Sequence, residues 1–204
     1  MLVAHMAIRT LFVTRLYEAM IDKPELIAEL EQSVRMLATD DRAGRGWSRA
    51  HGYRGYTSYA SLNDLPTRDP VIGDLVKLLN KHVAIFADAL HLDLARRLKV
   101  DSLWVNLMKP GATHSGHIHP HSVISGTFYV CVPPGSGGLK LEDPRLPLMM
   151  AAPPRDPEAP EDSRSFFYAE PRPGMVLLWE SWLRHEVPPS TAKGDRISIS
   201  FNYS

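Results

Sequence analysis

The sequence predicts a mainly β fold of the α+β class, in which helices from the first half pack on the outside of a double-sheet β core. Three observations predict it: apolar residues recur at helical spacing before residue 100, the period changes to two after Asp101, and seven short strands follow between turns rich in glycine and proline. The length of 204 residues suits one domain. We expect a single domain over 1–204, with a supporting region at 1–100 and the β core at 101–204.

The first half predicts one extended segment and two helices. Ile8–Tyr17 predicts a strand, and Asp22 follows in a position to cap a helix. The pair Asp69-Pro70 supplies a cap and a first-turn proline for a second helix with a long apolar stripe. Between these helices, residues 42–59 interleave arginine, glycine and aromatic residues. We interpret them as a loop and short strand bordering a ligand site.

The second half alternates apolar and polar residues over short segments, which is typical of strands that have one buried face. The predicted strands are Ser102–Met108, Val123–Val132, Leu139–Glu142, Phe166–Ala169, Met175–Trp179, His185–Val187 and Arg196–Tyr203. A proline-rich loop over 144–165 is long enough to form a lid.

Composition excludes several classes of protein. The 23 basic and 23 acidic residues balance, so the chain lacks the overall positive charge that attracts nucleic acid or anionic lipid. No segment approaches the roughly 20 apolar residues that span a bilayer, and the first residues do not resemble a signal peptide. We therefore expect a cytoplasmic protein. With Cys131 as the single cysteine, an internal disulfide and a cysteine-rich zinc module are excluded.

Four of the nine histidines fall within eight residues, at positions 114, 117, 119 and 121. His117 and His119 are two residues apart at the start of a predicted strand, so both would project to the same face. A divalent metal needs its ligands on one side of a stiff backbone. His185, at the start of a later strand, is the candidate for a third ligand, while His114 and His121 are alternates.

The last predicted strand gives a second signal. Its odd-numbered residues from Ile197 are apolar, and its even-numbered residues from Arg196 to Asn202 are polar. We expect this strand to be the hairpin neighbour of the strand that begins at His185, so that Arg196 and Ser198 point into the same interior. A buried arginine needs an anionic partner, and its planar fork of donors suits a carboxylate.

Several motifs over residues 102–204 resemble those of one enzyme family. They are Trp104-Val105-Asn106, His114-x-x-His117-x-His119-Pro120-x-Ser122, Ser125-Gly126 with Tyr129-Val130, Glu142-Asp143-Pro144-Arg145, the stretch from Gly174 to His185, and Arg196-Ile197-Ser198-Ile199-Ser200-Phe201. Together they resemble the iron(II)- and 2-oxoglutarate-dependent oxygenases, and in particular a bacterial branch known mainly as uncharacterised proteins.

The resemblance implies a double-stranded β-helix of the jelly-roll or cupin-like type. It also implies an enzyme that oxidises a small-molecule or peptide substrate, with Fe(II) as cofactor and 2-oxoglutarate as the co-substrate that is decarboxylated to succinate. Carried over by position, the metal ligands are His117, His119 and His185. Arg196 and Ser198 would bind the far carboxylate of 2-oxoglutarate.

Two points remain open within this resemblance. Tyr129 and Asn106 lie on strands whose side chains could reach the pocket, and they are further candidates for contacts with 2-oxoglutarate. His119 stands where the family has a carboxylate, so either the metal has three neutral histidine ligands or Glu142 or Asp143 supplies the acid.

Other functions fit part of the pattern. A cupin-like three-histidine enzyme that does not use 2-oxoglutarate would share the ligands but would leave Arg196 without a partner. A non-catalytic jelly-roll binding protein would hold the metal in a closed shell, whereas catalysis needs an open position. A zinc hydrolase of the metallo-β-lactamase type is disfavoured, because Pro120 stands where its motif has aspartate.

Overall fold

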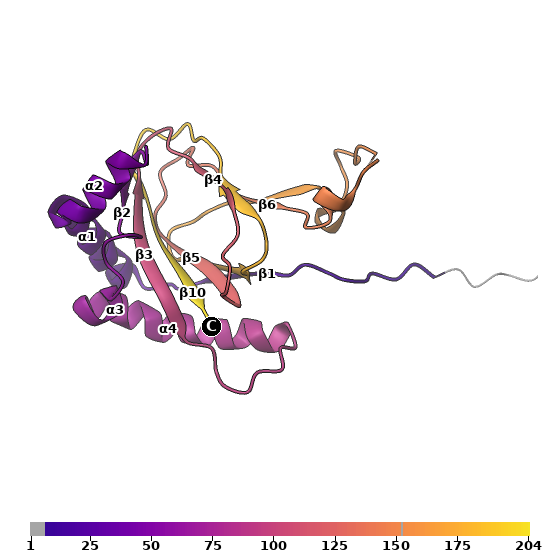
Figure 1. Ribbon diagram of the computed structural model, residues 1–204, viewed down its shortest axis with the longest axis horizontal. Helices are drawn as coiled ribbons and strands as arrows, with labels where there is room; N and C mark the ends of the chain where they lie inside the picture. The colour runs from indigo at the N-terminus through magenta and orange to yellow at the C-terminus, as the bar shows by residue number, and fades with distance from the viewer. Residues whose placement is uncertain (1–6, 152) are drawn as a thin grey trace, which may run out of the picture.

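The computed structural model describes residues 7–151 and 153–204. Two antiparallel sheets face one another, and helices cover the outer face of the larger sheet (Figure 1). The larger sheet has the order β1-β8-β5-β10-β3-β2, and the smaller has the order β4-β9-β6-β7. This arrangement confirms the predicted mainly β, α+β class with helices outside a double-sheet core.

Both sheets are built from short strands. The strands are β1 (Leu16–Met20), β2 (Gly55–Thr57), β3 (Val100–Met108), β4 (His114–His117), β5 (Ile124–Cys131), β6 (Leu139–Glu142), β7 (Phe166–Ala169), β8 (Met175–Glu180), β9 (His185–Val187) and β10 (Arg196–Tyr203). The helices are α1 (Pro24–Asp40), α2 (Arg42–Ala50), α3 (Leu65–Arg68) and α4 (Pro70–Ala89). The predicted strands of the second half therefore agree with the structure to within about two residues at each end.

The predicted cap of α4 is present, whereas that of α1 is not. Asp69 Oδ1 accepts a hydrogen bond from the Val71 backbone N–H at 3.0 Å, and Pro70 occupies the first helical position. In α1 the helical bonding begins at Lys23, whose carbonyl accepts from the Ile27 N–H at 3.1 Å. Asp22 therefore lies one residue too early to cap the helix.

Two expectations for the first half are wrong in detail. The opening strand covers Leu16–Met20 and not Ile8–Tyr17, because only these residues pair with β8, and residues 7–15 run out beyond the sheet (Figure 1). Residues 42–50, expected to be a loop, form α2. The Asp41 carboxylate caps this helix by accepting from the Gly44 N–H at 3.0 Å, and the arginines lie on its exposed side.

The central strand β10 separates two regions of core. Its odd-numbered side chains are completely buried and pack with the apolar faces of α1 and α4. Its even-numbered side chains face the space between the sheets, where Arg196, Ser198 and Ser200 line a cavity. The polar face of this strand therefore lies inside the protein.

The predicted hairpin between β9 and β10 is wrong. Strand β9 pairs with β4 and β6 in the smaller sheet, whereas β10 pairs with β3 and β5 in the larger one. The connection starts with Pro188-Pro189, which have no N–H group to continue a ladder, and the chain crosses from one sheet to the other. His185 and Arg196 still reach the same interior, because the sheets face one another.

Candidate metal centre

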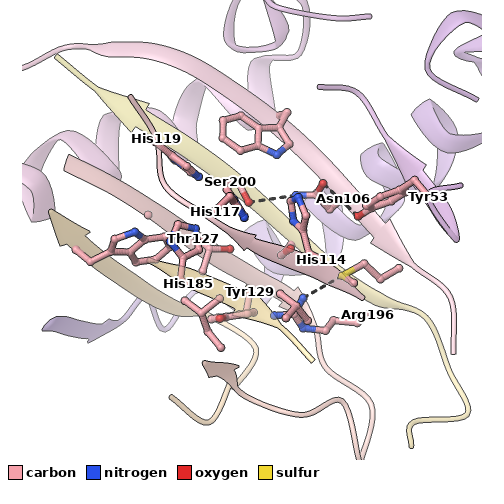
Figure 2. Close-up of a pocket in the computed structure, with 17 residues that line it drawn as sticks. Tyr53, Asn106, His114, His117, His119, Thr127, Tyr129, His185, Arg196 and Ser200 are labelled. Carbon is pink, nitrogen blue, oxygen red and sulfur yellow. Dashed lines mark hydrogen bonds between the residues drawn. The ribbon is translucent and has the colours of Figure 1, made fainter. Parts of the chain in front are cut away.

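Three histidines meet at one end of the cavity between the sheets. His117 ends β4, His119 follows it, and His185 begins β9 in register with His117. One ring nitrogen from each lies within 4.8 Å of the others, and Figure 2 shows the three rings converging. His119 is not on the strand as predicted. It precedes Pro120, and its N–H bonds to the Ser181 carbonyl at 2.9 Å, outside the β4–β9 ladder.

Backbone carbonyls fix the orientation of two of these rings. His117 Nδ1 donates to the Ser115 carbonyl at 2.7 Å, and His185 Nδ1 donates to the Leu183 carbonyl at 2.8 Å. A carbonyl oxygen only accepts, so Nδ1 carries the proton in both residues. The lone pair then resides on Nε2, which is the arrangement that metal-binding histidines commonly use.

A buried polar network orients the third ring. His119 Nδ1 lies 2.5 Å from Asn202 Oδ1 and 2.9 Å from Ser125 Oγ. The Asn202 amide nitrogen donates to Ser102 Oγ at 2.9 Å, so its oxygen is the atom that faces the imidazole. Ser125 Oγ donates to the same oxygen and contacts Ser181 Oγ at 2.8 Å. His119 Nδ1–H is therefore the donor, and Nε2 is free.

Burial keeps this part of the site neutral. Desolvation, with smaller contributions from the neighbouring histidines, lowers the pKa of His185 to about 3 and that of His114 to about 4. Desolvation also lowers the pKa of His119, although its bond to Asn202 opposes the shift. Unprotonated imidazoles at neutral pH have lone pairs available for a cation.

The alternate ligands occupy other places. His114 lines the cavity with its ring centre 4.5 Å from that of His117, but it is not part of the three-nitrogen cluster. His121 lies in an exposed turn with a positive φ of 71°. Glu142 pairs with Arg184 at 3.3 Å, and Asp143 pairs with Arg145 at 2.9 Å. Among the described residues, those that line the cavity include no aspartate or glutamate.

Arg196 lies at the other end of the cavity as a buried cation. Its side chain is 6% exposed, and in the described part of the chain it makes no ion pair with a carboxylate. Nη1 donates to Met108 Sδ at 3.3 Å, while Nε has no partner. The guanidinium lies 5.1 Å from the ring centre of Tyr129, whose buried hydroxyl also lacks a partner (Figure 2).

The remaining predicted residues line the same cavity. Ser198 follows Arg196 on the inner face of β10, and Asn106 on β3 donates to Ser200 Oγ at 3.1 Å. Sequence reasoning missed both the orienting role of Asn202 and the buried indole N–H of Trp179. Trp179 Nε1 is buried without a partner, and its ring centre lies 4.7 Å from that of His185. The alternation of β10 places Asn202 on the polar face, but no local signal identifies its partner.

The two ends of the cavity suit two different groups. Three imidazoles, each oriented by a hydrogen bond at Nδ1, fit a divalent cation. A buried guanidinium with an orphaned N–H, beside an orphaned hydroxyl, fits a carboxylate, because burying unpaired polar groups is otherwise costly. The site therefore fits a divalent metal together with an anion that carries a carboxylate.

The sequence over residues 102–202, about half of the chain, matches the protein family described as “Putative 2OG-Fe(II) oxygenase”. The chain belongs to the 2OG-Fe(II) oxygenase superfamily. It is an enzyme of the iron- and 2-oxoglutarate-dependent type, with Fe(II) as cofactor and 2-oxoglutarate as co-substrate. Among curated proteins, none matches its sequence.

Solved structures of other 2OG-Fe(II) oxygenases share this fold. A prolyl-4-hydroxylase from Pseudomonas putida is 16% identical with a TM-score of 0.58, over 93% of this chain and 92% of that one. EctD from S. alaskensis, with 2-oxoglutarate and 5-hydroxyectoine, is 13% identical with a TM-score of 0.65, over 94% and 72%. HygX from Streptomyces hygroscopicus, with nickel and 2-oxoglutarate bound, is 14% identical with a TM-score of 0.61, over 94% and 83%.

In the described residues of this oxygenase, no helix combines the length and apolar character that crossing a membrane requires.

Proposed function

We propose that this oxygenase holds Fe(II) through Nε2 of His117, His119 and His185, and holds 2-oxoglutarate through Arg196. The observation that carries the proposal is the buried, unpaired guanidinium at the opposite end of the cavity from three oriented imidazoles. A dicarboxylate could bind the metal through its keto-acid end and Arg196 through its other carboxylate, and so occupy both ends of the cavity.

The chain's own residues bind and orient the co-substrate. Arg196 supplies the positive charge for the far carboxylate, and the hydroxyls of Tyr129 and Ser198 add donors beside it. Asn106, fixed by its bond to Ser200, presents an amide to the same cavity. The apolar side chains of Leu139 and Val187 line the opposite wall and exclude water.

The reaction we assign is hydroxylation coupled to decarboxylation. Substrate R–H, O₂ and 2-oxoglutarate would give R–OH, succinate and CO₂, with one oxygen atom entering the product and the other entering succinate. Bound iron supplies the activation of O₂; the protein supplies orientation and a closed environment.

The surroundings of residue 119 favour a histidine over a carboxylate as the metal ligand at this position. Asn202 turns its oxygen, and not its nitrogen, towards this side chain because its nitrogen is bound to Ser102. That oxygen accepts from an imidazole N–H but would repel a carboxylate. The network therefore favours a three-histidine centre over the usual carboxylate at this position.

The decisive experiment is an anaerobic titration of the purified protein with Fe(II) and 2-oxoglutarate. We expect a weak visible absorption band when both are present, and oxygen-dependent formation of succinate from 2-oxoglutarate. Absence of both signals would overturn the proposal. Oxygen consumption that needs iron but not 2-oxoglutarate would instead favour a cupin-like three-histidine enzyme, which the neutral donor set also suits.

We further propose that residues 1–204 act as one domain in the cytoplasm. The two outermost strands of the larger sheet, β1 and β2, come from the first half of the chain and support this view of the domain. The balanced charge and single cysteine support the location.

A further inference from the structure

A second cavity, of about 300 Å³, adjoins the metal centre. The two cavities share six lining residues: Tyr53, Trp104, Asn106, His114, His117 and His119. A molecule in the second cavity would therefore lie directly beside the proposed iron ligands.

Four tyrosine and tryptophan side chains line this second cavity. Trp47 comes from α2, Tyr53 and Tyr59 flank β2, and Trp104 comes from β3. The ring centre of Tyr59 is 5.3 Å from that of Trp104, edge to face, and 6.1 Å from that of Trp47. Tyr59 is nevertheless 62% exposed, and Ile118 at the rim is 46% exposed. Exposed apolar surface grouped around a cavity commonly marks a ligand site.

The orientation of Trp47 is fixed from behind. His51 stacks on its indole with ring centres 4.1 Å apart, and His51 Nδ1 bonds to the Trp47 carbonyl at 2.9 Å. Because one face is covered in this way, the aromatic wall exists before any ligand arrives.

The side chains around the second cavity disfavour a charged ligand. No lysine, arginine, aspartate or glutamate is among the described residues that line the second cavity. A cationic ligand there would be repelled by Arg196 and by the bound metal. Neither cavity has a carboxylate among the described residues of its lining that would compensate for this repulsion. An anion would find no cationic side chain in the second cavity. Thr57 and Asn106 offer only neutral hydrogen-bonding groups.

We propose that this second cavity binds the molecule that the enzyme oxidises, and that this substrate is an uncharged small molecule with a flat ring. The assignment rests on the proposed function, because it takes the three histidines as the iron site. Ring faces would stack on the substrate, and one hydroxyl or carbonyl group of the substrate would bond to Thr57 or Asn106.

The test compares four probes that differ in charge or flatness. Tryptophol is neutral, tryptamine is cationic, indole-3-acetate is anionic, and 2-cyclohexylethanol is neutral but not flat. Calorimetry on the protein with Fe(II) and 2-oxoglutarate, without oxygen, should show tryptophol binding about 10-fold or more tightly than each of the others.

Two pairs of variants locate the binding site. Tyr59→Leu should weaken tryptophol binding about 3- to 10-fold, whereas Tyr168→Leu, at a tyrosine that is 50% exposed on β7, should leave it unchanged. Ile118→Asp should raise the affinity for tryptamine relative to tryptophol, because it adds the missing negative charge. Ile85→Asp, at an isoleucine 54% exposed on α4, should not.

The outcomes separate the two proposals. If 2-oxoglutarate binds while tryptophol does not, or while tryptamine binds most tightly, the substrate assignment is overturned and the proposed function stands. Equal effects of Tyr59→Leu and Tyr168→Leu would also overturn it. If 2-oxoglutarate fails to bind the iron-loaded protein, the proposed function falls, and the substrate role falls with it.

Discussion

Arg196 is buried and forms no ion pair with a carboxylate among the described residues. Replacing it with methionine keeps a flexible, unbranched apolar side chain but removes the charge and the hydrogen-bond donors. Arg196→Met should weaken binding of 2-oxoglutarate to the metal-loaded protein about 10- to 100-fold, as expected for lost charge-assisted hydrogen bonds. Calorimetric titration measures the affinity.

Arg184→Met is the matched control. Arg184 pairs with Glu142 and does not line the cavity, so this variant should bind 2-oxoglutarate like the unaltered protein. Unchanged affinity in Arg196→Met would refute the role assigned to that residue.

Asn202 determines which nitrogen of His119 carries the proton. Asn202→Leu removes the acceptor and should lower the affinity for Co(II), used as a stable probe metal, about 10-fold or more. Asn202→Asp restores an acceptor and should recover most of that affinity. Asn80→Leu, on α4, removes the acceptor of the Tyr203 hydroxyl; Asn80 lines neither cavity, so this variant should leave Co(II) binding intact. If the aspartate variant binds no better than the leucine variant, Asn202 does not act through His119.

The spacing of histidines in the sequence predicted which side chains cluster, but it did not predict the hydrogen bonds that orient them. Two histidines at i and i+2 and a later histidine predict one cluster, and the structure brings all three together. The partner of His119 is Asn202, 83 positions away, and no local pattern encodes a contact at that separation. The roles of these residues as ligands remain predictions until metal binding is measured.

Helix α2 shows why one element escaped prediction. Its buried face is made of Gly44 and Ser48 and not of large apolar residues, and glycine has a low helix propensity, so no apolar stripe marks it as a helix. Its stability comes instead from Asp41, whose carboxylate binds the Gly44 N–H, the Tyr56 hydroxyl at 2.9 Å and the Ser61 hydroxyl at 2.5 Å. These bonds lower the pKa of Asp41 despite its burial, which acts in the opposite direction.

Asp41→Ala should therefore destabilise the protein by about 1–2 kcal/mol, the range for a lost helix cap with additional bonds. Because α2 carries Trp47, the same variant should also weaken tryptophol binding. Asp40→Ala, one residue earlier on an exposed position, is the control. Urea unfolding gives the free energies; equal values for the two variants would contradict the capping role.

Strand pairing illustrates a different limit. Alternation located β9 and β10 correctly, but the short connection between them, residues 188–195, led to the wrong prediction of a hairpin. A period of two identifies the faces of a strand but not the sheet that the strand joins.

The loop over 144–165 was expected to be long enough to form a lid. Its described part projects beyond the end of β6 (Figure 1), and its described residues line neither cavity of the site. It does not act as a lid in this structure.

The whole molecule should lose stability in mild acid when it is free of metal. The pKa values of His185 and His114 are about 3 and 4 in the folded protein, against an ordinary value of 6.5. Between about pH 6.5 and pH 4 the unfolded chain therefore binds protons that the folded chain does not. The free energy of unfolding should fall as the pH falls through this window, by up to about 1.4 kcal/mol per pH unit for each histidine.

Urea unfolding of the EDTA-treated protein at pH 7 and pH 5 measures this loss. His185→Gln should reduce the difference between the two pH values, whereas His51→Gln, at an exposed position, should not. Equal stability of the parent protein at pH 7 and pH 5 would contradict the assigned burial effect.

The two faces of β10 have a consequence for how this enzyme can diverge. One strand carries Arg196, the proposed anchor for the co-substrate, and Asn202, which bonds to the proposed iron ligand His119, so its backbone sets the distance between the two ends of the proposed site. Its other face is the centre of the apolar core, and a slip by one residue would exchange the faces and unfold the protein. The aromatic wall lies instead on α2, on the segments around β2 and on β3, most of it outside this strand's ladder. If the second cavity binds the substrate as proposed, substitutions in its aromatic wall would change which molecule is oxidised and leave the proposed iron and 2-oxoglutarate sites intact.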